Sequence, residues 1–262
     1  MASLGERLWH YQRAVQQPEA VVTTIERIGI ELLGQPPTRL REDFAGTAAI
    51  AEAWVRLSDD HRALAVEHDQ ATAAWAARRI DADLGERAID CPVVVADVME
   101  LVGPRVDAVA ALNFSVGEWH DRPSLVRYLK HARRCLDRRG VVIVDLFGGR
   151  GAWHAPRRQR RRIVPSDGEP FDYVWEQRAV DPVRSRVTCT MHFDCEDGRW
   201  IDDAFAYDWR LWGVRELTDA MADAGLEAGV WAASGKGRGM QPVDRLPGED
   251  DWVAWVVGMK GP

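Results

Sequence analysis

Cysteine is scarce in this 262-residue sequence, which contains only four. They form no Cys-x-x-Cys pair, so the sequence carries no zinc-ribbon or thioredoxin-type motif. We therefore predict no bound metal. Cys189 and Cys195 could approach each other on neighbouring strands, but free thiols are the favoured interpretation of Cys91, Cys135, Cys189 and Cys195.

Long apolar runs are also missing. No run reaches membrane-spanning length, and no apolar segment of the signal-peptide type opens the chain. We therefore predict a cytoplasmic protein without membrane contact. The net charge of −7 disfavours nucleic-acid binding by the surface as a whole. A local exception is the run Arg157–Arg162, which we predict to be a solvated loop or a partner for the excess acids.

Two motifs of nicotinamide-dependent oxidoreductases do not occur. The sequence has neither Gly-x-Gly-x-x-Gly nor a Tyr-x-x-x-Lys pair, which disfavours that class. What the sequence does have in excess is tryptophan, with twelve residues against six Phe and four Tyr. These could form an aromatic substrate pocket, although packing in the core is the more common role of Trp.

Helical and strand patterns alternate through the first 150 residues, which predicts an α/β fold with a mostly parallel sheet. Helices are predicted for 3–17, 18–33, 47–58, 70–84 and 122–140. Strands are predicted for 38–44, 63–67, 92–97, 106–112 and 141–146. The strand at 38–44 is inferred from context alone, because its only apolar residues are Leu40 and Phe44.

The alternation stops after Gly151. Three strand-like segments follow at 171–180, 187–194 and 201–209, joined by the turn signals Asp181-Pro182 and Asp197-Gly198. This pattern predicts an antiparallel β-meander inserted after the fifth strand. A helix at 214–224 and two strands near 229–232 and 252–257 complete the chain.

Polar residues end each of the first five predicted strands: Glu42, Glu67, Asp97, Asn113 and Asp145. Ligands of open parallel sheets bind at these carboxyl ends. Between the first strand and its helix lies a small-residue turn that includes Ala45-Gly46, where the backbone can approach a ligand closely. Glu67 follows Glu42 by 25 residues (67 − 42), near the spacing of an acid that binds ribose hydroxyls.

At these residues the sequence resembles the class I S-adenosylmethionine-dependent methyltransferases, from about Leu40 to Phe147 and again after Trp212. The family's first loop reads acid-x-Gly-x-Gly-x-Gly and corresponds to residues 42–48. Gly46 is retained, whereas Phe44 and Ala48 stand where glycine is usual. The resemblance implies a Rossmann-like, seven-stranded, mostly parallel sheet and S-adenosylmethionine as cofactor, with S-adenosylhomocysteine as product.

The resemblance also implies roles for individual residues. The acid at Glu67 would take both ribose hydroxyls, Asp97 would meet the adenine amine, and the backbone N–H of Val98 would meet the ring. Tyr11 and Arg13 would fold over the cofactor and meet its carboxylate. The full set of expected cofactor-binding residues is Tyr11, Arg13, Glu42, Phe44, Ala45, Gly46, Thr47, Glu67, His68, Asp97, Val98, Asn113, Phe114 and Ser115.

The acceptor side is expected next to Asn113. Enzymes that methylate a base amine often carry two prolines after this position, and this sequence has neither. Candidate general bases are His120, Asp145 and Tyr207, with His154 and His192 as further histidines. A lone histidine is more often structural than catalytic. Expected acceptor contacts are Trp119, His120, Trp153, Trp175, Trp209 and Arg210.

We therefore expect residues 1–37 to cover the cofactor cleft, 38–150 and 210–262 to form the methyltransferase domain, and 151–209 to form an insert. The insert would cover the acceptor site, bind substrate or contribute to an oligomer such as a homodimer. The leading hypothesis is methylation of a small molecule, at nitrogen or oxygen rather than carbon. The alternatives are an RNA methyltransferase that docks through Arg157–Arg162 and a catalytically silent cofactor-binding protein.

Overall fold

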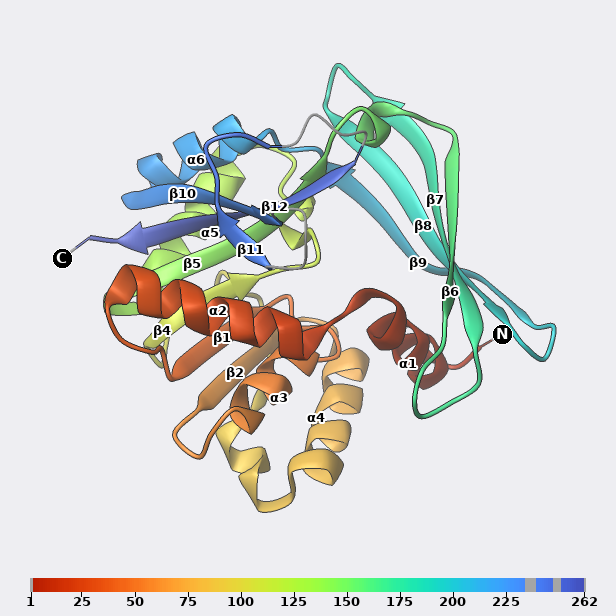
Figure 1. The fold of residues 1–262 in the computed structure, drawn as a ribbon, viewed down its shortest axis with the longest axis horizontal. Coiled ribbons are helices and arrows are strands. Elements are labelled where there is room, and N and C mark those ends of the chain that lie inside the picture. The colour runs from red at the N-terminus through yellow and green to blue at the C-terminus, as the bar shows by residue number, and fades with distance from the viewer. Residues whose placement is uncertain (1, 234–238, 247–250, 262) are drawn as a thin grey trace.

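The computed structural model describes residues 2–233, 239–246 and 251–261, and within them the strands form two sheets (Figure 1). The large sheet contains, in spatial order, β11 (Met240–Pro242), β10 (Leu226–Ala233), β12 (Trp252–Lys260), β5 (Leu136–Gly148), β4 (Val106–Ala111), β1 (Arg39–Asp43), β2 (Arg62–Glu67) and β3 (Val93–Val95). Strands β1 to β5 are parallel, whereas β12 runs antiparallel to both β5 and β10. This is the predicted Rossmann-like α/β architecture. The seven predicted strands are present, and β11 adds an eighth at the edge.

Helices cover both faces of the large sheet because each presents one apolar stripe. Helices α2 (Pro18–Leu33), α3 (Ala49–Arg56) and α4 (Gln70–Leu84) share one buried cluster with the sheet, which includes Trp54 and Ile143. Helices α5 (Arg122–Cys135) and α6 (Val214–Asp223) share the cluster on the other face, which includes Leu129 and Val144. Asp69 and Asp121 cap α4 and α5 through their side chains, as the sequence indicates.

The prediction that the helix after Asp121 continues to Gly140 is wrong. Helix α5 ends at Cys135, and Leu136 already has extended backbone angles and pairs with Val106 at the start of β5. Gly140 lies within β5, where a Cβ would approach the carbonyl oxygen of Asp107 to 2.9 Å. The apolar stripe continues across the junction because Leu136 is buried in either conformation, so periodicity alone could not place the helix end.

The small sheet is antiparallel and consists of β6 (Arg157–Ile163), β7 (Phe171–Asp181), β8 (Arg186–Cys195) and β9 (Trp200–Arg210). Three of these strands match the predicted meander. The fourth, β6, corrects the prediction of a basic loop. Its residues pair with β7 along the whole strand, for example Arg161 with Tyr173. Cys189 and Cys195 lie on the same strand, β8, so the suggested approach on neighbouring strands is also wrong; all four cysteines are free.

The basic run is a strand because its charges are compensated across the sheet. Alternation along β6 puts Arg158, Arg160 and Arg162 on one face. Each forms ion pairs there: Arg158 with Glu176, Arg160 with Asp172 and Asp194, and Arg162 with Asp172 and Glu196. Charged residues on an edge strand also oppose unwanted pairing.

Helix α1 (Leu4–Val15) lies beside the small sheet (Figure 1). Its residue Ala14 shares a buried cluster with Phe171, Phe193 and Ile201 of the small sheet. The other end of the small sheet packs on the large one through Trp209, Phe114 and Phe147. The helices of residues 2–233, 239–246 and 251–261 include none that is long and apolar enough to cross a membrane.

Candidate active site

A cavity of about 350 Å³ lies at the carboxyl ends of β1 and β2 and beside the segment that follows β3. Its walls come from the turn after β1, the end of β2, the segments after β3 and β4, helix α1 and strand β9. Predicted cofactor residues that line it are Tyr11, Phe44, Ala45, Gly46, Glu67, His68, Asp97, Val98, Asn113 and Ser115. We call this space the cofactor cavity.

The turn after β1 has left-handed backbone at three positions, with φ of 56° at Phe44, 54° at Gly46 and 54° at Ala48. Two of these residues carry a side chain where glycine would be unstrained, at a cost on the order of 1 kcal/mol each. Phe44 gains packing in return, because its ring contacts those of Tyr128 and Trp119 at 5.7 and 6.2 Å. The left-handed backbone therefore persists at Phe44 and Ala48 although neither is glycine.

Glu67 connects the turn after β1 with the segment after β2 through hydrogen bonds. One carboxylate oxygen, Oε2, accepts a hydrogen bond from Gly46 N–H at 2.8 Å, and Oε1 accepts one from Asp69 N–H at 2.8 Å. The residue is only 6% exposed. Each oxygen keeps a further lone pair for a ligand hydroxyl. His68 lies with its Nδ1 3.2 Å from Oε1 of Glu67 and its side chain largely in solvent.

Glu42 does not line the cavity, contrary to the expectation that it contacts the cofactor. Its Oε2 accepts a hydrogen bond from Ala51 N–H of α3 at 2.8 Å. Burial raises the pKa of Glu42 to about 8, against the opposing effects of that hydrogen bond and of Arg79. A carboxyl group that is mostly protonated at neutral pH is poorly suited to hold a cation. Its role here is to anchor α3.

The turn after β4 has left-handed backbone at Asn113 and Phe114, with φ of 59° and 63°. Asp145 on β5 stabilises this turn: its carboxylate accepts hydrogen bonds from the backbone N–H of Asn113 at 3.0 Å and of Phe114 at 2.7 Å. Burial raises the pKa of Asp145 to about 7, and the two hydrogen bonds act in the opposite direction. Asp145 lines neither this cavity nor the larger one between the two sheets, so it positions the turn rather than acting as the predicted base.

The N-terminal helix places Tyr11 in the wall of the cavity, and its C-terminal end adds Gln16, which was not among the expected residues. Gln16 caps α1, lines the cavity and accepts a hydrogen bond from the Thr47 hydroxyl at 2.6 Å. Thr47 itself is fully buried beneath the turn. Arg13 does not line the cavity: its guanidinium pairs with Asp167 and stacks on Trp9 at 4.2 Å, and its contact with a cofactor carboxylate stays a prediction.

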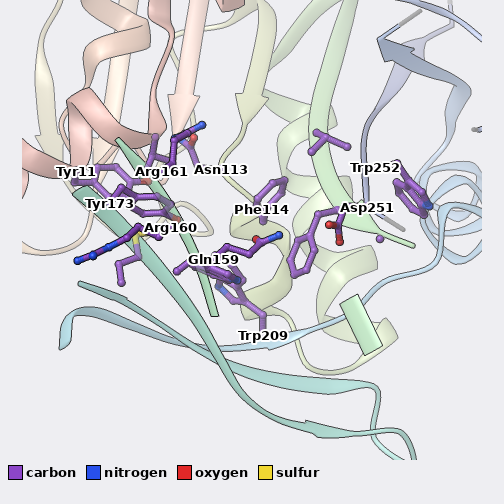
Figure 2. A pocket seen from close by; sticks show the side chains of 16 residues that line it. Tyr11, Asn113, Phe114, Gln159, Arg160, Arg161, Tyr173, Trp209, Asp251 and Trp252 are labelled. Atoms are coloured by element: carbon purple, nitrogen blue, oxygen red, sulfur yellow. The ribbon is translucent and has the colours of Figure 1, made fainter. Parts of the chain in front are cut away.

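A second, larger cavity of about 630 Å³ lies between the large sheet and the inner face of the small sheet. Figure 2 shows Tyr11 and Tyr173 at one end, Asp251 and Trp252 at the other, and Phe114, Gln159 and Trp209 between them. It shares three lining residues with the cofactor cavity, namely Tyr11, Asn113 and Trp209. We call it the acceptor cavity.

The predicted aromatic wall exists in part. Trp209 and Trp175 line the acceptor cavity and stack with their ring centroids 5.9 Å apart. Trp119 lines the cofactor cavity instead, and its indole N–H is buried without a hydrogen-bond partner. Trp153 is 47% exposed and lines neither cavity. Arg210 is held by the His120 carbonyl and by Glu216, also outside both.

The predicted bases are poorly placed for proton transfer. His120 donates from Nε2 to the Asp208 carbonyl at 2.7 Å and lines neither cavity. Tyr207 lines the cofactor cavity, but burial raises its pKa well above that of a free phenol, so it stays protonated. His154 also lies outside the cavities.

His192 lies on the outer face of the small sheet, away from both cavities. Its Nδ1 is 2.7 Å from Asp202, and its Nε2 is 3.2 Å from Glu176. His192, Asp202 and Asp203 lie close enough together to share a metal ion. The expectation of no bound metal stays a prediction.

Glu118 is a second site residue that sequence reasoning missed. It lines the cofactor cavity and accepts a hydrogen bond from the Trp209 indole at 2.8 Å. Neither Glu118 nor Gln16 belongs to a motif with recognisable spacing. Gln16 reaches the cavity from the C-terminal end of α1, and Glu118 reaches it from the 3-10 turn Ser115–Glu118 that follows β4.

Gly117 fixes the position of Trp209. A Cβ there would lie 2.7 Å from Cγ and 2.8 Å from Cβ of Trp209. Because Trp209 borders both cavities, we expect Gly117→Ala to displace the indole, to lower the free energy of unfolding by about 1–3 kcal/mol, and to weaken cofactor binding. Chemical denaturation and calorimetry measure the two effects. Gly213→Ala is the control, since its added Cβ makes only ordinary contacts. Equal behaviour of the two variants would contradict this role of Gly117.

No protein-family model and no curated protein matches the sequence. Solved structures do share its fold. The sugar N-methyltransferase KedS8 from Streptoalloteichus sp. is 21% identical, with 97% of this chain and 91% of that chain covered at a TM-score of 0.68. An S-adenosylmethionine-dependent methyltransferase from Clostridium acetobutylicum is 16% identical, with 97% of both chains covered at 0.71. The amino pentose methyltransferase CalS10 from Micromonospora echinaspora is 14% identical, with 97% and 95% covered at 0.68. The similarity covers the inserted small sheet as well as the large one.

Proposed function

We propose that this protein is an S-adenosylmethionine-dependent methyltransferase that acts on a small molecule. The observation that carries the proposal is the pair of cavities that share Tyr11, Asn113 and Trp209. A donor in one cavity and an acceptor in the other would meet at these three residues. The fold, which is shared with solved methyltransferases along nearly the whole chain, supports the same conclusion.

The residues of the cofactor cavity fit an adenosyl group. Carboxylates at Glu67 and Asp97 are acceptors for ribose hydroxyls and for the adenine amine. The indole N–H of Trp119 is a buried donor that lacks a partner, which costs on the order of 1–3 kcal/mol unless a ligand accepts from it. Bound S-adenosylmethionine would supply an electrophilic methyl group on a sulfonium. The chain would orient that group toward the acceptor cavity.

The acceptor cavity favours an amine among the nitrogen and oxygen acceptors. Its described lining contains no histidine, lysine or cysteine, and its one carboxylate, Asp251, pairs with Arg157. Without a base to remove a proton, an alcohol is a poor nucleophile. An uncharged amine attacks through its lone pair as the C–S bond breaks toward sulfur, and the product loses its proton to water. The protonated form of the amine, which is a cation, would be attracted to the ring faces of Trp175 and Trp209 before it loses its proton.

The experiment that tests this function uses methyl-labelled S-adenosylmethionine. The protein is incubated with it and a small-molecule extract, or with bulk tRNA. We expect label in small molecules, on nitrogen, and none in RNA. Label in tRNA would support the RNA alternative. Cofactor binding without transfer to any extract would support the catalytically silent alternative.

Substitutions in the basic strand β6 separate the small-molecule hypothesis from the RNA alternative. Because Arg158 and Arg162 are paired with acids on the outer face of β6 and line neither cavity, we expect Arg158→Gln and Arg162→Gln each to change the free energy of unfolding by less than about 1 kcal/mol. Transfer to the small molecule should be unchanged. Loss of activity together with loss of tRNA affinity, measured by filter binding, would contradict this view of β6.

Two further expectations belong to the proposal. The insert 151–209 contributes Trp175 and Trp209 to the acceptor cavity, which supports its role in shaping that site. A cytoplasmic location and a homodimer stay predictions, and cell fractionation and analytical ultracentrifugation test them.

A further inference from the structure

An ion pair is buried in the large sheet directly beneath the cofactor cavity. Arg41 and Asp43 alternate with Glu42 along β1, so both face α5, and their side chains are 0% exposed. Arg41 Nε donates to Asp43 Oδ1 at 2.6 Å. The Tyr128 hydroxyl of α5 donates to the other oxygen, Oδ2, at 3.0 Å.

The guanidinium also holds the segment that follows β3. Its Nη2 donates to the Val98 carbonyl at 3.0 Å, and its Nη1 donates to the Leu101 carbonyl at 2.6 Å. These two residues follow Asp97, whose carboxylate is expected to accept a hydrogen bond from the adenine amine. Arg41 therefore forms hydrogen bonds with the backbone segment directly after Asp97, although Arg41 itself does not line the cavity.

The same network reaches two other walls of the cavity. Asp43 directly precedes Phe44, the first residue of the turn after β1. The Tyr128 ring stacks on Trp119 with centroids 5.7 Å apart and 29° between the planes, and it contacts Phe44 at 5.7 Å. Three walls of the cavity thus converge on three connected polar side chains.

Stability alone does not explain a charged pair at this position. A buried ion pair is often no more stabilising than apolar residues of similar volume, because desolvation offsets the attraction between the charges. The surrounding residues on this face, such as Val66 and Val109, are apolar. What apolar residues could not do is hold two backbone carbonyls of an irregular segment at fixed positions.

We propose that Arg41, Asp43 and Tyr128 are positioning residues for the segment that contains Asp97 and Val98, which forms the wall of the cofactor cavity expected to contact adenine. Arg41 fixes the 98–101 segment, and Asp43 and Tyr128 fix Arg41. The consequence is base selectivity: a correctly placed Asp97 carboxylate accepts from the adenine amine and disfavours a base with a carbonyl there. This inference rests on the proposed function.

The test compares two ligands by calorimetry, S-adenosylhomocysteine and S-inosylhomocysteine, in which a carbonyl replaces the amine. We expect the intact protein to prefer the adenine compound at least tenfold. Tyr128→Phe removes only the hydroxyl and should reduce this preference several-fold. The double variant Arg41→Met/Asp43→Leu removes both charges together and should bring the preference close to one. Asp97→Ala should abolish it, and adding Tyr128→Phe to Asp97→Ala should cause no further change.

A merely structural network would give a different result. It would weaken both ligands equally and leave their ratio unchanged, and that outcome in folded Tyr128→Phe would overturn the inference even if the double variant fails to fold. Failure of the intact protein to bind either ligand would instead count against the proposed function. If the intact protein prefers the adenine compound and the variants keep that preference, the inference is overturned but the proposed function is not.

Discussion

Replacing Glu67 with alanine is expected to weaken the binding of S-adenosylhomocysteine by about 10- to 100-fold. Hydrogen bonds to a charged group contribute about 1.5–3 kcal/mol each, and about 1.4 kcal/mol corresponds to a factor of ten in affinity. Glu67 is the carboxylate at the end of β2 that lines the cofactor cavity. Isothermal titration calorimetry measures the change. Glu86→Ala, which removes an exposed carboxylate outside both cavities, is the matched control.

Glu67 also accepts hydrogen bonds from Gly46 and Asp69, so the variant could weaken binding by disturbing the turn. An analogue without the 2′ and 3′ hydroxyls separates the two effects. If Glu67 binds the ribose, the substitution should weaken the parent ligand but hardly change the affinity for the analogue. Equal losses for both ligands would show that Glu67 only supports the turn.

Asp145→Asn is expected to reduce methyl transfer more than tenfold while leaving the protein folded. The carboxylate accepts from two backbone N–H groups, of Asn113 and Phe114, and an amide would oppose one of them with a donor. A buried donor without an acceptor costs about 1–3 kcal/mol. Because this turn borders both cavities, its displacement should lower kcat/KM. Steady-state kinetics measures the loss, with Asp81→Asn on the exposed side of α4 as control.

The pH dependence of this residue has a defined sign. Burial raises the pKa of Asp145 from 3.8 to about 7 in the folded state. Its contribution to stability is therefore present below about pH 4 and is lost as the pH rises to 7. Ionisation in the same range strengthens the hydrogen bonds to the turn, so kcat/KM should rise through pH 7. Asp145→Asn should lack both changes. An unaltered pH profile in the variant would assign the titration to another group.

The parallel sheet could be predicted because most of its strands are apolar runs that can be recognised in the sequence. Val106–Leu112 is a continuous apolar run, and Asp69 and Asp121 cap the helices that they precede. Strand β1 had no such signal, since Arg41, Glu42 and Asp43 are charged and yet buried. They tolerate burial through partners distant in sequence, such as Tyr128. Local periodicity carries no information about those partners.

Some residues of the candidate site could also be predicted from the sequence, whereas others could not. Glu67 and Asp97 could be placed together because parallel strands end at one edge of the sheet, and both line the cofactor cavity. Arg13 and Arg210 could not be placed, because each guanidinium is bound by residues far along the chain or by backbone carbonyls. The aromatic wall was only partly predictable, because the directions of Trp175 and Trp209 depend on the pairing of β7 and β9 with β8 and on the space at Gly117.

In the proposed complex, an adenosyl group binds between Glu67, Asp97 and the turn after β1, with its sulfur toward the acceptor cavity. A crystal structure of the protein with S-adenosylhomocysteine tests it most directly. We expect the ribose on Glu67, the adenine amine on Asp97 and the sulfur beside Asn113 and Trp209. A ligand bound elsewhere, or this cavity empty at saturating concentrations, would contradict it.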